Sequence, residues 1–130
     1  MTVAVQWLEI EMILAVHDEA LAIDGGAPGL RDHGLLESAL ERPKNRYHYE
    51  GVEDLCDLAA TYAVGIAKNH PFADGNKRSA FIAMATFLMV NGRPLHASQA
   101  DATTTMLAVA AGDMDIATLA EWIRVNTAAT

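Results

Sequence analysis

Apolar residues recur every three to four positions along most of the chain, the spacing that places them on one face of an α-helix. This pattern predicts helices over residues 7–23, 32–42, 52–69, 76–91, 99–110 and 114–126. The alternation typical of strands is scarce and alanine is abundant, which also favours helices. We therefore predict an all-α fold, a single domain (1–130) built as a bundle of about six helices.

Proline, glycine and capping residues set the expected helix ends. Pro43 should end the second helix, because proline lacks an N–H group and clashes with the preceding turn. The polar, aromatic and basic segment 43–51 is then expected to be a loop. It is either simply solvated or a flap beside a cleft that positions a target segment. Ser98, and Asp113 or Asp115, are suited to begin the last two helices as N-caps.

The fourth helical segment, 76–91, is apolar on nearly every side. A helix that is apolar all round is usually the buried centre of a bundle. We therefore expect this helix to be central, with its methionines filling the core.

Composition and charge exclude several classes of protein. The net charge of −8 makes general nucleic-acid binding unexpected. The lone Cys56 rules out a disulfide within the chain and favours the cytoplasm. The N-terminus has no signal-peptide pattern. The longest apolar run, 80–90, is interrupted by Thr86 and is far shorter than the roughly 20 residues of a membrane helix. We expect a cytoplasmic monomer.

The chemistry of the chain gathers in one stretch, His70 to Arg78, between two predicted helices. Asp74 and Gly75 form a turn signal, and Gly75 is suited to positive φ and to close approach of a ligand. The loop should aim free N–H groups and the positive end of a helix dipole at an anion. Lys77 adds positive charge there, as does Arg78.

Two side chains of this stretch suit proton transfer and metal binding. The imidazole of His70 titrates near neutrality and is suited to act as a general base. Asp74 offers a hard oxygen ligand of the kind that Mg²⁺ takes when it also holds phosphates. Each feature alone has an ordinary structural explanation, but their combination at one helix–loop–helix junction favours a phosphate-handling site. Walker and GxGxxG motifs are missing, and scattered histidines make a zinc site improbable. His17, in the first helix, is expected to be only a core or surface histidine.

The stretch HPFADGNKR resembles the signature of the Fic/Doc family, His-x-Phe-x-(Asp/Glu)-Gly-Asn-(Gly/Lys)-Arg. A second stretch, GLRDHGLLESALERP, resembles the corresponding part of Doc-like chains. The resemblance implies that His70 activates a target hydroxyl, that Asp74 holds Mg²⁺, and that Asn76, the loop backbone and Arg78 hold the phosphates of ATP.

Two positions indicate the Doc toxin branch. Family members that transfer AMP usually have glycine where this chain has Lys77, and a second arginine where it has Phe81. Doc-like toxins of toxin–antitoxin pairs are kinases that transfer the terminal phosphate of a nucleotide to elongation factor Tu, which arrests translation. The resemblance therefore implies such a kinase, with an antitoxin filling the cleft. Lys77 would hold phosphate as a point charge.

Two alternatives remain open from the sequence. One is an adenylyl transferase of the same fold, and the other is a catalytically silent binding module. The inhibitory Ser/Thr-x-x-x-Glu-Gly/Asn motif of many Fic relatives is missing, so restraint would have to come from another chain.

Overall fold

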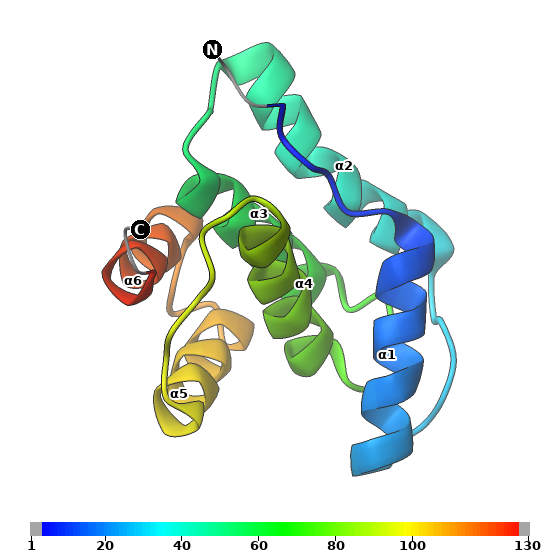
Figure 1. Ribbon diagram of the computed structural model, residues 1–130. Helices are drawn as coiled ribbons and strands as arrows, with labels where there is room; N and C mark the ends of the chain where they lie inside the picture. Colours follow the sequence, from blue (N-terminus) through cyan, green and yellow to red (C-terminus); the bar gives the residue numbers. More distant parts are fainter. Residues whose placement is uncertain (1–3, 128–130) are drawn as a thin grey trace.

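The computed structural model describes residues 4–127, and their regular structure is helical (Figure 1). The helices are α1 (Ile10–Asp24), α2 (His33–Glu50), α3 (Leu55–Asn69), α4 (Asn76–Val90), α5 (Gln99–Ala110) and α6 (Ile116–Asn126). The predicted all-α bundle of about six helices is thus confirmed. Strand-like pairing within residues 4–127 is limited to the isolated bridges Leu30–Phe72 and Leu95–Thr127. None of these helices has the length and apolar character needed to cross a membrane.

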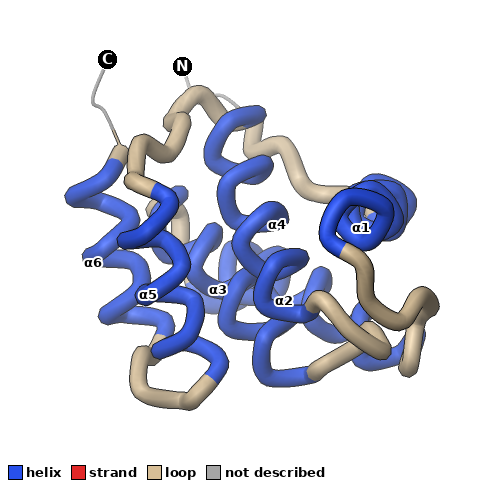
Figure 2. Tube along the Cα trace, turned by 90° about the horizontal axis from the view of Figure 1, so that it is seen from below, coloured by secondary structure: helices blue, strands red, loops and turns tan. Residues whose placement is uncertain are grey.

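Helices α3 and α4 lie in the middle of the molecule, with α1 and α2 on one side and α5 and α6 on the other (Figures 1 and 2). The expectation that α4 is the central helix was wrong, because α3 packs against α2, α4, α5 and α6. The last turn of α4 is partly solvated, and Met89 there is 61% exposed. Apolar composition alone therefore did not identify the central helix.

Small residues explain why α3 occupies the centre. Ala59, Ala60, Ala63 and Ala67 are all buried and let neighbouring helices approach from several directions. A Cβ atom added at Gly65 would lie 3.3 Å from the Cβ of Ala39, so α2 crosses α3 at close range there. Larger side chains complete the core between α3 and α4, among them Tyr62 and Phe87, whose ring centroids are 5.1 Å apart.

Helix α2 continues through Pro43 to Glu50, which corrects the predicted helix end and the predicted loop over 43–51. A proline inside a helix costs about 3 kcal/mol, and tertiary contacts offset that cost. Pro43 is buried, and Arg46 donates a hydrogen bond of 2.7 Å to the hydroxyl of Thr61 on α3. The ring of Tyr47 packs edge-on against Trp7 at 5.4 Å.

The same correction removes the proposed flap. A helix rises about 1.5 Å per residue, so Tyr47 lies roughly 20 Å along α2 from its N-cap, Asp32. It is Asp32, and not the far end of α2, that adjoins the 70–78 loop, through its N–H bond of 3.0 Å to the carbonyl of Pro71.

Side-chain caps fix the start of four helices. The carboxylates of Asp32, Asp54 and Asp115 accept N–H groups at the starts of α2, α3 and α6, and the hydroxyl of Ser98 does so at α5. The expected caps Ser98 and Asp115 are therefore confirmed. Gly92, with φ 81°, follows the end of α4 and confirms the predicted stop.

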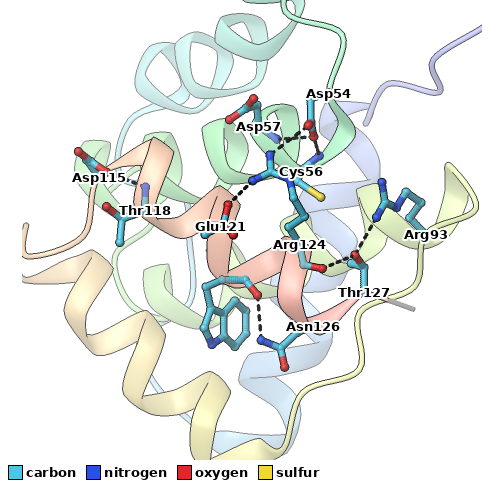
Figure 3. Close-up of polar contacts among 11 residues, drawn as sticks. Asp54, Cys56, Asp57, Arg93, Asp115, Thr118, Glu121, Arg124, Asn126 and Thr127 are labelled. Atoms are coloured by element: carbon cyan, nitrogen blue, oxygen red, sulfur yellow. Dashed lines mark hydrogen bonds and ion pairs between the residues drawn. The ribbon is translucent and has the colours of Figure 1, made fainter. Parts of the chain in front are cut away.

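A polar cluster ties α6 to the start of α3 (Figure 3). Arg124 donates to the carboxylate of Asp54 at 3.0 Å and to that of Glu121 at 2.6 Å. Burial alone would raise the pKa of Asp54, but the hydrogen bonds from Arg124 and from the N–H of Cys56 hold it below its usual value. Burial raises the pKa of the Cys56 thiol, so this cysteine is an inert core residue.

Candidate active site at the start of helix α4

The 70–78 loop leaves α3 at His70, the only non-glycine residue with positive φ (48°) among residues 4–127. Helix α3 ends at Asn69, which is the predicted end of the segment 52–69. Phe72 is 1% exposed and anchors the loop in the core, while the side chain of His70 faces solvent. The loop thus combines a fixed apolar anchor with an accessible imidazole.

The segment just before α2 runs alongside the loop and holds its backbone. The N–H groups of Arg31 and Asp32 both donate to the carbonyl of Pro71, at 2.7 and 3.0 Å, and Ala73 donates to the carbonyl of Gly29 at 3.1 Å. The guanidinium of Arg31 also donates to the carbonyls of His70 (2.7 Å) and Asn69 (2.9 Å). It thereby caps the C-terminus of α3, where cations are favourable. No local pattern around Arg31 indicated this role.

The carboxamide of Asn76 braces the inside of the loop. Its Oδ1 accepts the N–H of Phe72 at 3.0 Å, and its Nδ2 donates to the carbonyl of the same residue at 3.0 Å. These two hydrogen bonds distinguish the oxygen of the carboxamide from its nitrogen. Nδ2 therefore also faces Nδ1 of His70, at 3.3 Å.

The contact with Asn76 defines the resting state of His70. An amide N–H group donates, so a neutral His70 accepts at Nδ1 and carries its proton on Nε2. At 3.3 Å the contact is longer than a typical hydrogen bond and is easily broken. The lone pair of the imidazole is therefore held in a defined direction but remains available for a stronger partner.

Asp74 is exposed at the turn of the loop, and its Oδ1 accepts the N–H of Gly75 at 2.8 Å. Its Oδ2 makes no hydrogen bond to any residue in 4–127 and is available to a ligand. No group of three or more potential metal ligands exists in this part of the chain. A single free carboxylate fits Mg²⁺ that takes its other ligands from phosphates and water, as this ion commonly does.

His17 on α1 contacts the loop from behind, a role that the sequence did not indicate. Its ring stacks on Phe72 with centroids 3.8 Å apart, and its Nε2 donates to the carbonyl of Asp74 at 2.7 Å. The side chain is only 2% exposed. His17 is thus a core histidine, as expected, but one that touches the loop directly.

The N-terminus of α4 is open, in contrast to the capped starts of α2, α3, α5 and α6. Gly75 precedes the helix with φ 78°, as predicted, and no side chain caps the first turn. The first hydrogen bond of the helix runs from Ser79 N–H to the carbonyl of Gly75, at 2.9 Å. The N–H groups of residues 76 and 77 therefore lack partners within the helix and, beside the exposed side chains of Lys77 and Arg78, favour an anion.

A groove of about 560 Å³ extends from this helix start between α4 and α5. Lys77 and Arg78 line one end, and Phe81, Ile82 and Met106 are among its apolar walls. The residue that stands in place of the second arginine of AMP-transferring enzymes, Phe81, thus contributes apolar surface to this groove. The side chain of Lys77 makes no ion pair or hydrogen bond with any residue in 4–127.

The chain is similar to known proteins over most of its length. Residues 7–88 match the model of the Fic/DOC family. The chain is 36% identical over 114 residues to "Protein kinase doc" of Escherichia phage P1, covering 88% of this chain and 90% of the relative. It is 39% identical over 93 residues to "Toxin Doc" of Mycolicibacterium smegmatis, covering 71% of this chain and 69% of the relative.

Proposed function

The chain belongs to the Fic/DOC family, and on this premise we propose that it is a toxin that acts as a protein kinase. It would transfer the terminal phosphate of ATP to a hydroxyl group of a target protein. The observation that carries the proposal is the open start of α4, where free N–H groups and two cations lie next to the His70–Asn76 pair. The names of the two relatives, a protein kinase and a toxin, support the proposed kinase activity and the proposed toxicity.

Five residues of the loop have a task in this reaction, namely His70, Asp74, Asn76, Lys77 and Arg78. The N–H groups of the first turn of α4, including that of Asn76, hold the phosphate together with Lys77 and Arg78. The side chain of Asn76 directs His70. Asp74 would hold Mg²⁺, which neutralises phosphate charge when bound. Such positioning and charge stabilisation account for most catalysis of phosphoryl transfer.

Proton transfer falls to His70. The target hydroxyl approaches Nδ1 and displaces the 3.3 Å contact with Asn76. As the hydroxyl oxygen bonds to the terminal phosphorus, its proton moves to Nδ1, and the bond from phosphorus to the bridging oxygen breaks to release ADP. A positioned base of this kind contributes roughly 10²–10⁴ in rate.

The preference for phosphate over AMP transfer rests on Lys77 and Phe81. A long cationic side chain at Lys77 fills space over the loop and holds phosphate oxygens, while Phe81 cannot provide the second arginine. We propose elongation factor Tu as the target, with arrest of translation as the consequence. This follows from the likeness to Doc toxins.

The groove between α4 and α5 suits the antitoxin partner. Its walls include Phe81, Ile82, Met106 and Leu107, and its rim carries Lys77 and Arg78. An amphipathic helix with an apolar face and acidic flanks complements such a surface. Filling the groove would also cover the two cations that the reaction needs, so one segment would block activity.

Mass spectrometry of elongation factor Tu, incubated with the protein, Mg²⁺ and ATP, tests the proposal. The added mass is expected to be one phosphate; an added AMP would identify an adenylyl transferase, and no addition would contradict the proposed kinase activity.

Lys77→Gly and Lys77→Met separate the charge of the Lys77 side chain from its bulk, because methionine restores bulk without charge. Both should lose most phosphorylation if the charge matters, and only Lys77→Gly should do so if bulk alone matters.

Expression in bacteria tests the proposed toxicity. Growth should stop on induction of the parent chain and continue with His70→Ala. Harmless expression of the parent at high level, without any partner, would contradict the toxin reading.

A further inference from the structure

Helix α1 borders the 70–78 loop with the side chains of His17 and Leu21, of which His17 is buried. This residue lies outside the 70–78 signature, yet it contacts two of the loop residues and lies close to a third. Its ring stacks nearly parallel on Phe72, at an angle of 10°, and its Nε2 lies 2.7 Å from the carbonyl oxygen of Asp74. A Cβ atom added at Gly75 would lie 3.5 Å from the same nitrogen.

The hydrogen bond fixes the protonation of the ring. A carbonyl oxygen only accepts, so Nε2 of His17 carries the proton. The other nitrogen, Nδ1, lies 4.0 Å from the carboxylate of Asp18, which is beyond hydrogen-bond range. His17 therefore directs one donor at one acceptor, the main chain of Asp74.

The peptide group between Asp74 and Gly75 is consequently held at both polar atoms. His17 binds its carbonyl, and Oδ1 of Asp74 binds its N–H group at 2.8 Å. A peptide group is planar, so fixing both atoms fixes the plane. That plane sets the direction of the Asp74 side chain on one side and the left-handed turn at Gly75 on the other.

The segment after α1 closes the opposite side of the carboxylate. A Cβ atom added at Gly26 would lie 2.7 Å from Oδ2 of Asp74 and 3.0 Å from Leu21 on α1. The carboxylate thus lies directly against the backbone of Gly26. Helix α1 and its C-terminal turn therefore border Asp74 on two sides, while its carboxylate stays exposed to solvent.

We propose that His17 is a positioning residue that sets the orientation of the Asp74 carboxylate and of the start of α4 by donating a hydrogen bond to the carbonyl of Asp74. The effect of His17 on the binding of Mg²⁺ and ATP rests on the proposed function. Its effect on the conformation of the loop does not. A histidine that served only to fill the core would act through its stack on Phe72 alone.

Two substitutions separate the donor from the stack. His17→Phe keeps an aromatic ring against Phe72 and removes the donor. His17→Gln removes the ring and keeps an N–H group at a reach similar to that of Nε2. Ile13→Val, a buried change one turn earlier on α1, is the control for general loosening of that helix.

Amide hydrogen exchange of Ala73, Gly75 and Ser79, whose N–H groups are hydrogen-bonded, tests the proposal without any assay of activity. Loss of a hydrogen bond should speed exchange there about tenfold in His17→Phe, with little change in His17→Gln or Ile13→Val. Unchanged exchange in His17→Phe, or an equal increase in all three variants, would overturn the positioning role.

The Mg²⁺ dependence of phosphoryl transfer gives a second readout. The half-saturating Mg²⁺ concentration should rise about tenfold in His17→Phe and remain near the parent value in His17→Gln. An unchanged Mg²⁺ requirement with faster exchange would confine the role of His17 to the loop and overturn its effect on Asp74. If the parent transfers no phosphate, the proposed function fails and the exchange result alone decides the role of His17.

Discussion

Truncating Asn76 to alanine should destabilise the protein by about 2–4 kcal/mol. The carboxamide satisfies both main-chain polar groups of Phe72, at 3.0 Å each, and Phe72 is 1% exposed. Asn76→Ala leaves that N–H and that carbonyl buried without partners, and each such orphan costs about 1–3 kcal/mol. We take the lower part of the summed range, because the loop adjoins solvent and water can reach part of the gap.

Urea unfolding measures this change. Domains typically have a net stability of about 5–15 kcal/mol, so the variant should still fold. With an m-value of about 1–3 kcal/mol/M, its urea midpoint should fall by roughly 1–2 M. Tryptophan fluorescence reports on both sides of the bundle, since Trp7 packs on Phe87 with ring centroids 6.0 Å apart and Trp122 lies on α6.

Asn69→Ala is the matched control, because it truncates the same kind of side chain at the other end of the loop. The amide of Asn69 donates one hydrogen bond, of 2.9 Å, to the carbonyl of Leu35. Its loss should cost about 1 kcal/mol. If Asn76→Ala costs no more than Asn69→Ala, the reasoning about the orphaned groups of Phe72 is refuted, and the amide of Asn76 is free to bind phosphate directly.

Three further predictions follow from the same structure. His70→Ala should reduce phosphoryl transfer at least ~10²-fold and leave the urea midpoint nearly unchanged, because its side chain is exposed; near-full transfer would remove it as the base. Asp74→Ala should abolish the Mg²⁺ dependence of ATP binding in titration calorimetry, and persistence of that dependence would exclude Asp74 as the metal ligand. Burial raises the pKa of Tyr62 to about 12, above the value of about 10 in the unfolded chain. Its contribution to stability, about 3 kcal/mol for two pKa units, is therefore complete below pH 10 and is lost as the pH rises towards 12. Urea midpoints at several alkaline pH values should show this loss in the parent and a smaller one in Tyr62→Phe.

The sequence predicted helix ends and turns well where the interaction that forms them joins residues within one helical turn of each other. Ser98 and Asp115 cap helices because their side chains bond the next N–H groups along the chain. Gly75 and Gly92 adopt positive φ, as turn residues do. The 70–78 loop could be predicted for the same reason, since its residues are consecutive.

Features that depend on distant contacts could not be read in this way. The passage of α2 through Pro43 depends on Arg46 reaching Thr61 and on Tyr47 packing against Trp7. The central place of α3 depends on how closely its small residues let other helices approach. The contacts of His17 and Arg31 with the loop depend on how α1 and the segment before α2 fold back. For the contacts of His17 with the loop, the only indication in the sequence was a lone histidine within an apolar helical pattern.

The anchoring of the catalytic loop has a consequence for the order in which the chain is made. Its supports outside the loop, His17, Gly29 and Arg31, all precede it in the sequence. These three supporting residues therefore leave the ribosome before the loop does. The site is complete only when Asn76 and the first turn of α4 have also emerged. Domains begin to fold during synthesis, but this loop can take its supported form only after more than half of the chain has been translated. The groove that we propose for an antitoxin is completed later still, because α5 forms one of its walls.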